Sequence, residues 1–189
     1  MKKIITKVFA LIIVLIGVVV LNGCGSDEEG TVNKDLKAYD GGSFSIQVDP
    51  TWKIMTPTDF FDEIPKETVV AFTAPEVFDG FFINVNIVRE DLKKEVAAID
   101  YARANINLSA QNLTDYEKVQ EAKIDIGEIP TLIHIFQARL NPSEKLIRFV
   151  QLYATNGRYG YIVTGGMLPD TPKSLREKVG AMVTSFMIK

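Results

Sequence analysis

The chain has a single histidine, His134, which limits the chemistry that its side chains can do. A metal site built on two histidines is excluded. A Ser-His-Asp triad on a nucleophile elbow is also excluded, because no Gly-x-Ser-x-Gly sequence occurs. His134 lies between Ile133 and Ile135, where alternation puts it on the face of Leu132 and Phe136. We therefore predict a structural or surface histidine.

The acidic side chains do not form a pattern typical of catalysis or metal binding. Asp62-Glu63 and Glu90-Asp91 are neighbours in the chain, whereas a two-carboxylate hydrolase needs acids that converge across a cleft, about 5 to 9 Å apart. No calcium loop of the Asp-x-Asp-x-Asp-Gly type occurs. Gly165-Gly166 is followed by neither a dinucleotide fingerprint nor a phosphate-binding lysine, so we expect these glycines in a turn. The sequence predicts a protein that is not an enzyme and binds no cofactor or metal.

The only cysteine, Cys24, follows a stretch with the composition of a secretory signal. Three lysines come first, and an apolar run without charge then extends from Val8 to Leu21. This run suits the apolar region of a signal peptide, whereas a membrane-spanning helix needs about 20 apolar residues. An uncleaved membrane anchor is the alternative, because Ile4 and Ile5 lengthen the apolar stretch across Lys7.

The boundary Leu21-Asn22-Gly23-Cys24 favours cleavage, since it resembles the lipobox of bacterial lipoproteins. In that family a diacylglycerol is attached to the cysteine thiol, and cleavage leaves the modified cysteine as the first residue. The resemblance implies a signal peptide over residues 1–23 and lipidation of Cys24, with acyl chains that hold the protein on the extracytoplasmic side of a cell membrane. Residues 24–35 are then a flexible tether, because Gly, Ser, Asp and Glu dominate their composition.

Cleavage before Cys24 leaves 166 of the 189 residues, which is enough for one domain with its own core. The signal takes away three of the 21 basic residues and none of the 24 acidic ones, so the net charge changes from −3 to −6. A net acidic domain is not expected to bind nucleic acid. Its attachment to the membrane would then depend on the lipid anchor at Cys24.

Alternating or β-branched runs predict strands at residues 44–48, 52–55, 68–73, 81–89, 118–126, 132–140, 145–154 and 158–164. We expect Pro75 to end the strand at 68–73. Asn141-Pro142-Ser143 and Asn156-Gly157 are turn sequences, so the last three strands are predicted to form an antiparallel meander.

Two segments have the spacing of an amphipathic helix instead. The first stripe consists of Ile99, Ala102, Ile106, Ala110 and Leu113, and the second of Leu175, Val179, Met182, Val183 and Phe186. Thr171-Pro172 is expected to begin the second helix, with threonine as its N-cap. Strands with one helix between them and another at the end predict a single α+β domain over residues 36–189.

The segment Phe44-x-Ile46-x-Val48-x-Pro50-x-Trp52 resembles the start of PsbP-like domains, a superfamily that includes the DcrB-type bacterial lipoproteins. The order of elements is also similar: hairpin strands, a helix, a three-strand meander, and a terminal helix that closes with Ser185-Phe186. The resemblance covers about residues 36–189 and implies an αβα sandwich around a twisted antiparallel sheet. It also implies a non-catalytic role, because relatives mostly act by docking to other proteins. We expect Trp52 to be buried under the C-terminal helix.

One loop is a candidate contact surface. The turn signal Asp79-Gly80 is flanked by Phe78, Phe81 and Phe82. Core packing explains one or two of these rings, but all three cannot point inward, so we expect at least one to be exposed. The first predicted function is therefore a lipid-anchored, non-catalytic binding or assembly module for an envelope protein or complex. The alternative is a carrier of a small apolar ligand in a cavity between sheet and helices.

Overall fold

The computed structural model describes residues 36–61 and 64–189. The predicted signal peptide, the lipidation site Cys24 and the tether lie outside the described residues, and so do Asp62 and Glu63. None of the helices in the described ranges has the length and apolar character needed to cross a membrane.

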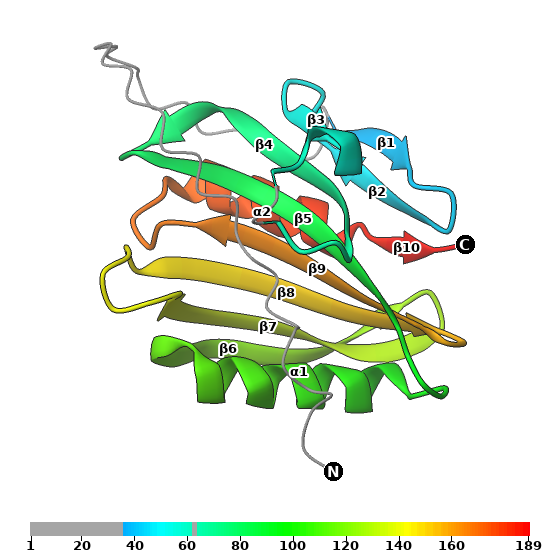
Figure 1. The fold of residues 1–189 in the computed structure, drawn as a ribbon. Coiled ribbons are helices and arrows are strands. Elements are labelled where there is room, and N and C mark those ends of the chain that lie inside the picture. Colours follow the sequence, from blue (N-terminus) through cyan, green and yellow to red (C-terminus); the bar gives the residue numbers. More distant parts are fainter. Residues whose placement is uncertain (1–35, 62–63) are drawn as a thin grey trace.

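Within these ranges, seven strands form one antiparallel sheet in the order β3-β4-β5-β9-β8-β7-β6 (Figure 1). They are β3 (Lys53–Met55), β4 (Thr68–Phe78), β5 (Phe81–Asp91), β6 (Thr114–Ile126), β7 (Ile129–Arg139), β8 (Ile147–Asn156) and β9 (Tyr159–Met167). A smaller sheet has the order β1-β2-β10, with β1 (Lys37–Asp40), β2 (Phe44–Val48) and β10 (Met187–Ile188). The predicted meander is confirmed, because β7, β8 and β9 are consecutive neighbours.

Two helices lie on opposite faces of the large sheet. Helix α1 (Ala98–Asn112) packs on β7 and β8, and helix α2 (Lys173–Thr184) packs on β8, β9 and β2. Side chains of β8 alternate between the two layers: Tyr153 packs with Tyr101 of α1, whereas Leu152 and Ala154 belong to the core cluster that contains Val179 of α2. A short 3-10 helix, η1 (Pro57–Asp59), follows β3. The predicted α+β fold with helices on both faces of an antiparallel sheet is confirmed.

Trp52 lies in the main core, with only 5% of its surface exposed, in the cluster that includes the buried stripe of α2. The turn before it is fastened to α2, because Lys178 donates to the buried carboxylate of Asp49. The backbone N–H and the hydroxyl of Thr51 also donate to that carboxylate, at 2.9 and 2.6 Å. Burial alone would raise the pKa of Asp49, but the hydrogen bonds from Lys178 and Thr51 outweigh it and hold the pKa below its usual value.

The buried stripe of α1 differs from the predicted one. Ala102 and Ile106 are buried as expected, but Ala110 is exposed, and Tyr101 and Asn105 are buried in its place. The two polar side chains are satisfied there: Tyr101 donates to Glu90, and Asn105 donates to the carbonyl oxygen of residue 101. Polar groups can be buried at low cost when they are hydrogen-bonded. The spacing of apolar residues alone therefore does not reveal which polar residues of a helix are buried.

Two predictions about strand ends are wrong. Pro75 does not end its strand, because β4 continues to Phe78 through an irregularity between Thr73 and Val77, where a residue without an N–H is tolerated. Gly165 and its neighbour Gly166 lie inside β9 rather than in a turn. A Cβ at Gly165 would stand 2.3 Å from Cγ1 of Val179, so this glycine allows α2 to approach the sheet closely.

Other observed boundaries also differ from the predicted ones. Helix α2 begins at Lys173 with Pro172 at its N-cap, and Thr171 is buried without capping it, so the predicted cap is wrong by one residue. Strand β6 begins at Thr114, four residues earlier than predicted. Strands β1 and β10 were not predicted. They are short and pair with β2, which holds both of them in the small sheet.

Candidate functional site

The β4–β5 hairpin carries the phenylalanine-rich turn, here called the aromatic turn (Val77–Phe82). Asp79 and Gly80 have φ angles of 45° and 70°, so both central residues occupy the left-handed region that a type I′ hairpin requires. The predicted tight turn is confirmed. Val77 pairs with Phe82 and Phe78 pairs with Phe81 across the ladder, so the apolar side chains of this turn stand beside one another.

The three phenylalanines are not equally exposed. Phe81 is buried in a cluster at this end of the sheet, whereas Phe78 and Phe82 are half-buried. No ring is fully exposed, so the expected exposure is met only in part. The exposed apolar side chain is instead Val77, at 43%. An apolar edge that reaches the surface from a firmly packed base is suited to contact with another protein.

The aromatic turn is held in place by the loop between β7 and β8. Lys145 of that loop donates to the carboxylate of Asp79 at 2.7 Å and also to its carbonyl oxygen. The ion pair is exposed, so its contribution to stability is small. Its geometry nevertheless links two neighbouring turns at the same end of the sheet.

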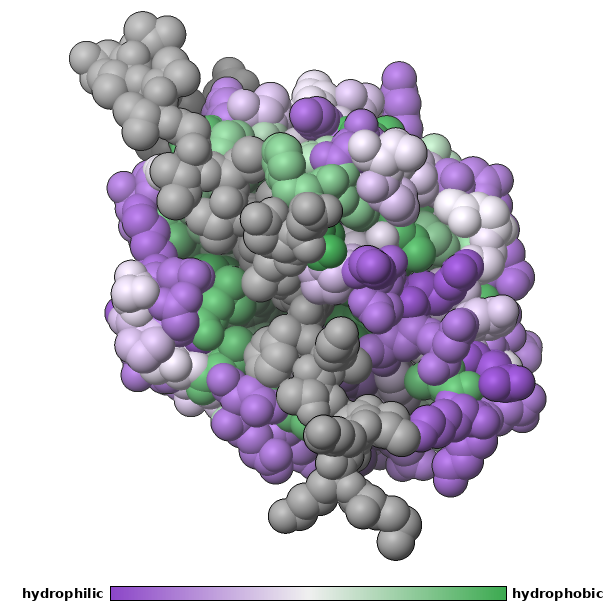
Figure 2. Space-filling model, in the orientation of Figure 1, coloured by the Kyte–Doolittle hydropathy of each residue, from purple (hydrophilic) through white to green (hydrophobic). Residues whose placement is uncertain are grey.

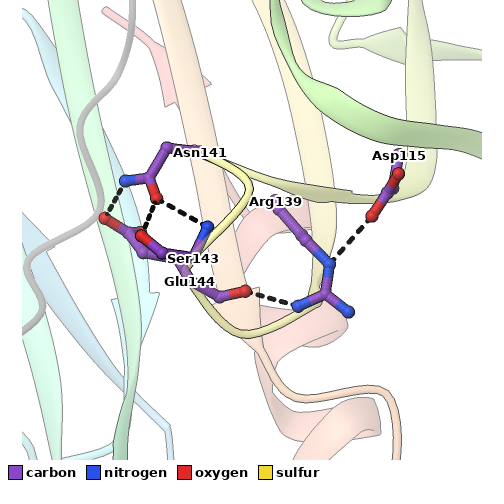
Figure 3. Close-up of polar contacts among 5 residues, drawn as sticks. All are labelled: Asp115, Arg139, Asn141, Ser143 and Glu144. Atoms are coloured by element: carbon purple, nitrogen blue, oxygen red, sulfur yellow. Dashed lines mark hydrogen bonds and ion pairs between the residues drawn. The ribbon is translucent and has the colours of Figure 1, made fainter.

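The β7–β8 loop has its own polar network (Figure 3). Arg139 donates from Nε to Asp115 at 2.9 Å and from a terminal nitrogen to the carbonyl oxygen of Glu144. Oδ1 of Asn141 accepts from the backbone N–H and the hydroxyl of Ser143, at 3.1 and 2.6 Å. These contacts close the loop on itself, so the surface beside the aromatic turn is well defined.

The face seen in Figure 2 has apolar residues gathered at the left end of the sheet, between the β4–β5 hairpin and the β7–β8 loop. The lower edge, where α1 lies, is mainly hydrophilic in the same view. Phe61, in the loop after η1, is the most exposed of the large apolar side chains in the described part of the chain, at 58%. From the sequence, core packing and surface contact were both open for the pair Phe60-Phe61; in the structure Phe60 packs against a small core cluster and Phe61 is exposed.

His134 is buried beside aromatic side chains. Its Nε2 is 2.9 Å from the hydroxyl of Tyr116, and its ring stacks on Phe136 with the centroids 4.7 Å apart. Burial lowers the pKa of His134 to about 4, so the ring is neutral at pH 7. No serine or carboxylate within the described residues hydrogen-bonds to it, and its Nδ1 has no partner among them. This environment agrees with the predicted structural role.

His134 ends a row of buried polar side chains that crosses the sheet. Register places Asn86, Thr164, Gln151 and His134 side by side on four neighbouring strands. Gln151 donates to the hydroxyl of Thr164 at 3.0 Å and accepts from the hydroxyl of Tyr153 at 2.7 Å. This row was not predicted from the sequence. The only trace of the row in the sequence is one polar residue in each of the four strands, at positions that face the same side of the sheet. A sheet face exposed to solvent has the same pattern.

In the acidic pair Glu90-Asp91, Glu90 is held by a tyrosine of α1. Glu90 accepts a hydrogen bond of 2.6 Å from the hydroxyl of Tyr101. Burial raises the pKa of Glu90 above its usual value, although the hydrogen bond from Tyr101 opposes this shift. The pKa of the Tyr101 hydroxyl is also raised, first by burial and then by the charge of Glu90. Within residues 36–61 and 64–189, no group of three His, Cys, Asp or Glu side chains could hold a metal ion.

A groove of about 380 Å³ runs between α2 and strands β7 and β8. Its floor is apolar and includes Ile133, Ile135 and Val150, while Lys173 and Arg176 of α2 stand on its rim. The carrier hypothesis predicted a cavity lined by isoleucine, valine and phenylalanine between sheet and helix. The groove lies in that position, but its lining contains cationic side chains and no phenylalanine.

No protein-family model matches the sequence, and no curated protein matches it. Solved structures do match the fold. The cyanobacterial PsbP protein (CyanoP) from Synechocystis sp. PCC 6803 is similar over 89% of this chain and 99% of its own, with 13% identity and a TM-score of 0.56. The domain has the PsbP-like fold.

Two further structures agree. The Ran-binding protein Mog1p from Saccharomyces cerevisiae matches over 81% of this chain and 95% of its own, with 10% identity and a TM-score of 0.53. PA94 from Pseudomonas aeruginosa, a protein of unknown function, matches over 80% of this chain and 96% of its own, with 14% identity and a TM-score of 0.52. At such low identity the likeness concerns the fold, and function has to be argued from the site.

Proposed function

We propose that this chain is a lipid-anchored, non-catalytic binding module that works outside the cytoplasm and docks to another envelope protein through its aromatic turn. The signal-like residues 1–23 and the lipobox-like boundary at Cys24 support the anchor and the location. The surroundings of His134 and Glu90 support a non-catalytic role, because each is held by a tyrosine rather than by a reaction partner.

The observation that carries the proposal is the graded burial of the aromatic turn. Val77 is exposed and Phe78 and Phe82 are half-buried, while Phe81 packs beneath them in the core. Lys145 links the turn to the β7–β8 loop through Asp79. The tight type I′ turn and the packing of Phe81 order this apolar edge, so it loses little conformational freedom when a partner covers it. Aromatic side chains are enriched at protein interfaces.

The test is crosslinking in the native envelope, followed by identification of the captured protein. Phe82→Ser should lower capture at least tenfold, because a tenfold loss needs about 1.4 kcal/mol and the change removes a whole aromatic ring from the contact. Val77→Ser should lower capture by a smaller factor, because valine has less apolar surface to lose. Val77→Ser removes little buried area, so it should fold like the wild-type protein.

Val119 provides a matched control. It is also a strand valine, with 42% of its surface exposed, but it lies in β6, at the edge of the sheet. Val119→Ser should leave capture unchanged. Equal capture by Val77→Ser, Phe82→Ser and the wild-type protein would contradict docking through the aromatic turn.

A further inference from the structure

We infer that the groove between α2 and strands β7 and β8 binds a single-chain amphiphile with an anionic head, of the alkyl-carboxylate class. The groove shares no residue with the aromatic turn, so this binding goes beyond the proposed docking and does not depend on it. Three features of the groove fit such a ligand: one end is cationic, the floor is apolar, and the length suits an alkyl chain.

One end of the groove is cationic. Arg148, Lys173 and Arg176 line it, against one acid, Glu177, which lies 3.7 Å from Lys173. Arg148 forms no ion pair with any described side chain, and Arg176 gives one of its five N–H groups to the carbonyl oxygen of Thr171. Helix α2 also begins here without an acidic residue in its first turn, so its dipole adds to the positive potential.

This local charge contrasts with the composition of the chain, whose net charge is −3. A cationic cluster in an acidic protein concentrates anions locally. The guanidinium of Arg148 and the ammonium of Lys173 can each donate to a carboxylate oxygen. We therefore assign the anionic head of the ligand to the end of the groove at the start of α2.

The floor and the other end of the groove suit an alkyl chain. Ile133 and Ile135 are half-buried on the sheet side, because α2 does not cover β7. On the helix side the wall contains Gly180, where an added Cβ would meet nothing within 4 Å. Glycine inside a helix is unfavourable relative to alanine, and the packing within the described chain does not require it here. Its effect is to keep the groove open for an occupant.

The length of the groove suits an alkyl chain of moderate length. Lining residues of α2 extend from Lys173 to Thr184, a distance of about 16 Å at 1.5 Å per residue. An extended chain advances roughly 1.2 Å per bond, so about 13 atoms fit along it.

The test uses the full-length protein in its own membranes and a photoreactive dodecanoate as the probe. Labelling should map by mass spectrometry to peptides of α2, β7 and β8. Unlabelled dodecanoate should compete at least ten times better than dodecanol, because the alcohol lacks the anionic head.

Gly180→Leu should lower labelling at least fivefold, since the new side chain fills the groove without a clash inside the helix. Ser174→Leu adds the same side chain on α2 at an exposed residue that does not line the groove, and it should label like the wild-type protein. The double variant Arg148→Gln/Lys173→Gln changes only the head end and should remove the preference for dodecanoate over dodecanol. Val77→Ser should keep full labelling, which separates this site from docking.

Three results would overturn the inference. They are equal labelling of Gly180→Leu and the wild-type protein, equal competition by dodecanol and dodecanoate, and protection of the groove by an acidic amphipathic peptide but not by dodecanoate. The last result would assign the groove to a protein partner.

Discussion

Lowering the pH from 7 to 5 should reduce the free energy of unfolding by about 2 kcal/mol, because His134 is held neutral in the folded protein. Burial lowers the pKa of His134 to about 4, whereas an unfolded histidine has a pKa near 6.5. The unfolded state therefore binds more protons between these values. The contribution of neutral His134 to the free energy of unfolding is fully present above pH 6.5, and it is lost progressively as the pH falls toward 4.

The magnitude follows from the two pKa values. The pKa of His134 is near 6.5 in the unfolded state and about 4 in the folded state. Proton linkage with these values lowers the free energy of unfolding by about 2 kcal/mol between pH 7 and pH 5. Two other shifted groups contribute little or oppose this loss. Asp49 has a lowered pKa, so its stabilisation is lost only below the unfolded value near 3.8. Glu90 has a raised pKa, so its protonation favours the folded state as the pH falls.

The assay is urea unfolding followed by the fluorescence of the buried Trp52, at several pH values between 5 and 7.5. The comparison variant is His134→Phe, which preserves stacking on Phe136 but cannot titrate. It loses the hydrogen bond to Tyr116, which should cost about 1 kcal/mol at every pH. Its stability should therefore be lower but nearly flat between pH 7 and 5. A pH dependence parallel to that of the wild-type protein would refute the assignment to His134.

Three further predictions concern the core and the anchor. Trp52→Ala should destabilise the domain by about 3–5 kcal/mol in urea unfolding followed by circular dichroism, and a loss below about 1 kcal/mol would contradict its place in the core. Gly165→Ala should destabilise by about 1–3 kcal/mol, because its methyl group would overlap Val179, whereas Gly180→Ala should stabilise by up to about 1 kcal/mol. Equal effects at these two glycines would contradict the packing of α2. Cys24→Ala should move the protein from the detergent phase to the aqueous phase or leave an unprocessed precursor, and an unmodified Cys24 in processed native protein would contradict lipidation.

Much of the fold could be predicted because it depends on periodicity and turn chemistry. Alternation identified β2 and β5, and Asp79-Gly80 identified the hairpin between β4 and β5. These signals are local, so they are readable without the tertiary structure. The stripe on α2 was also clear, because its apolar residues all face one core, to which β2, β8 and β9 contribute.

The errors come from interactions between segments distant in sequence. Gly165 was placed in a turn because glycine disfavours strands, but the close approach of Val179 from α2 requires it inside β9. Pro75 was read as a strand end, but an irregularity in the pairing of β4 accommodates it. Asn86 and His134 have the pattern of polar residues on an open face, yet both are buried.

The candidate site could be predicted only in part. The phenylalanine-rich turn was identified from its composition, but the sequence does not reveal which ring is buried, because that depends on neighbours from β7, β8 and the residues after β9. The exposure of Val77 was therefore missed. The groove beside α2 could not be located either, because Arg148 and Lys173 come together only through the packing of the helix on the sheet.

Site-specific photocrosslinking tests docking through the aromatic turn most directly. A photoreactive amino acid placed at residue 77 of the full-length protein, in its native envelope, should capture one discrete protein partner on irradiation. The same photoreactive residue at position 119, which is equally exposed on the β6 edge, should capture none. Identical products from both positions, or capture from position 119 alone, would contradict the account.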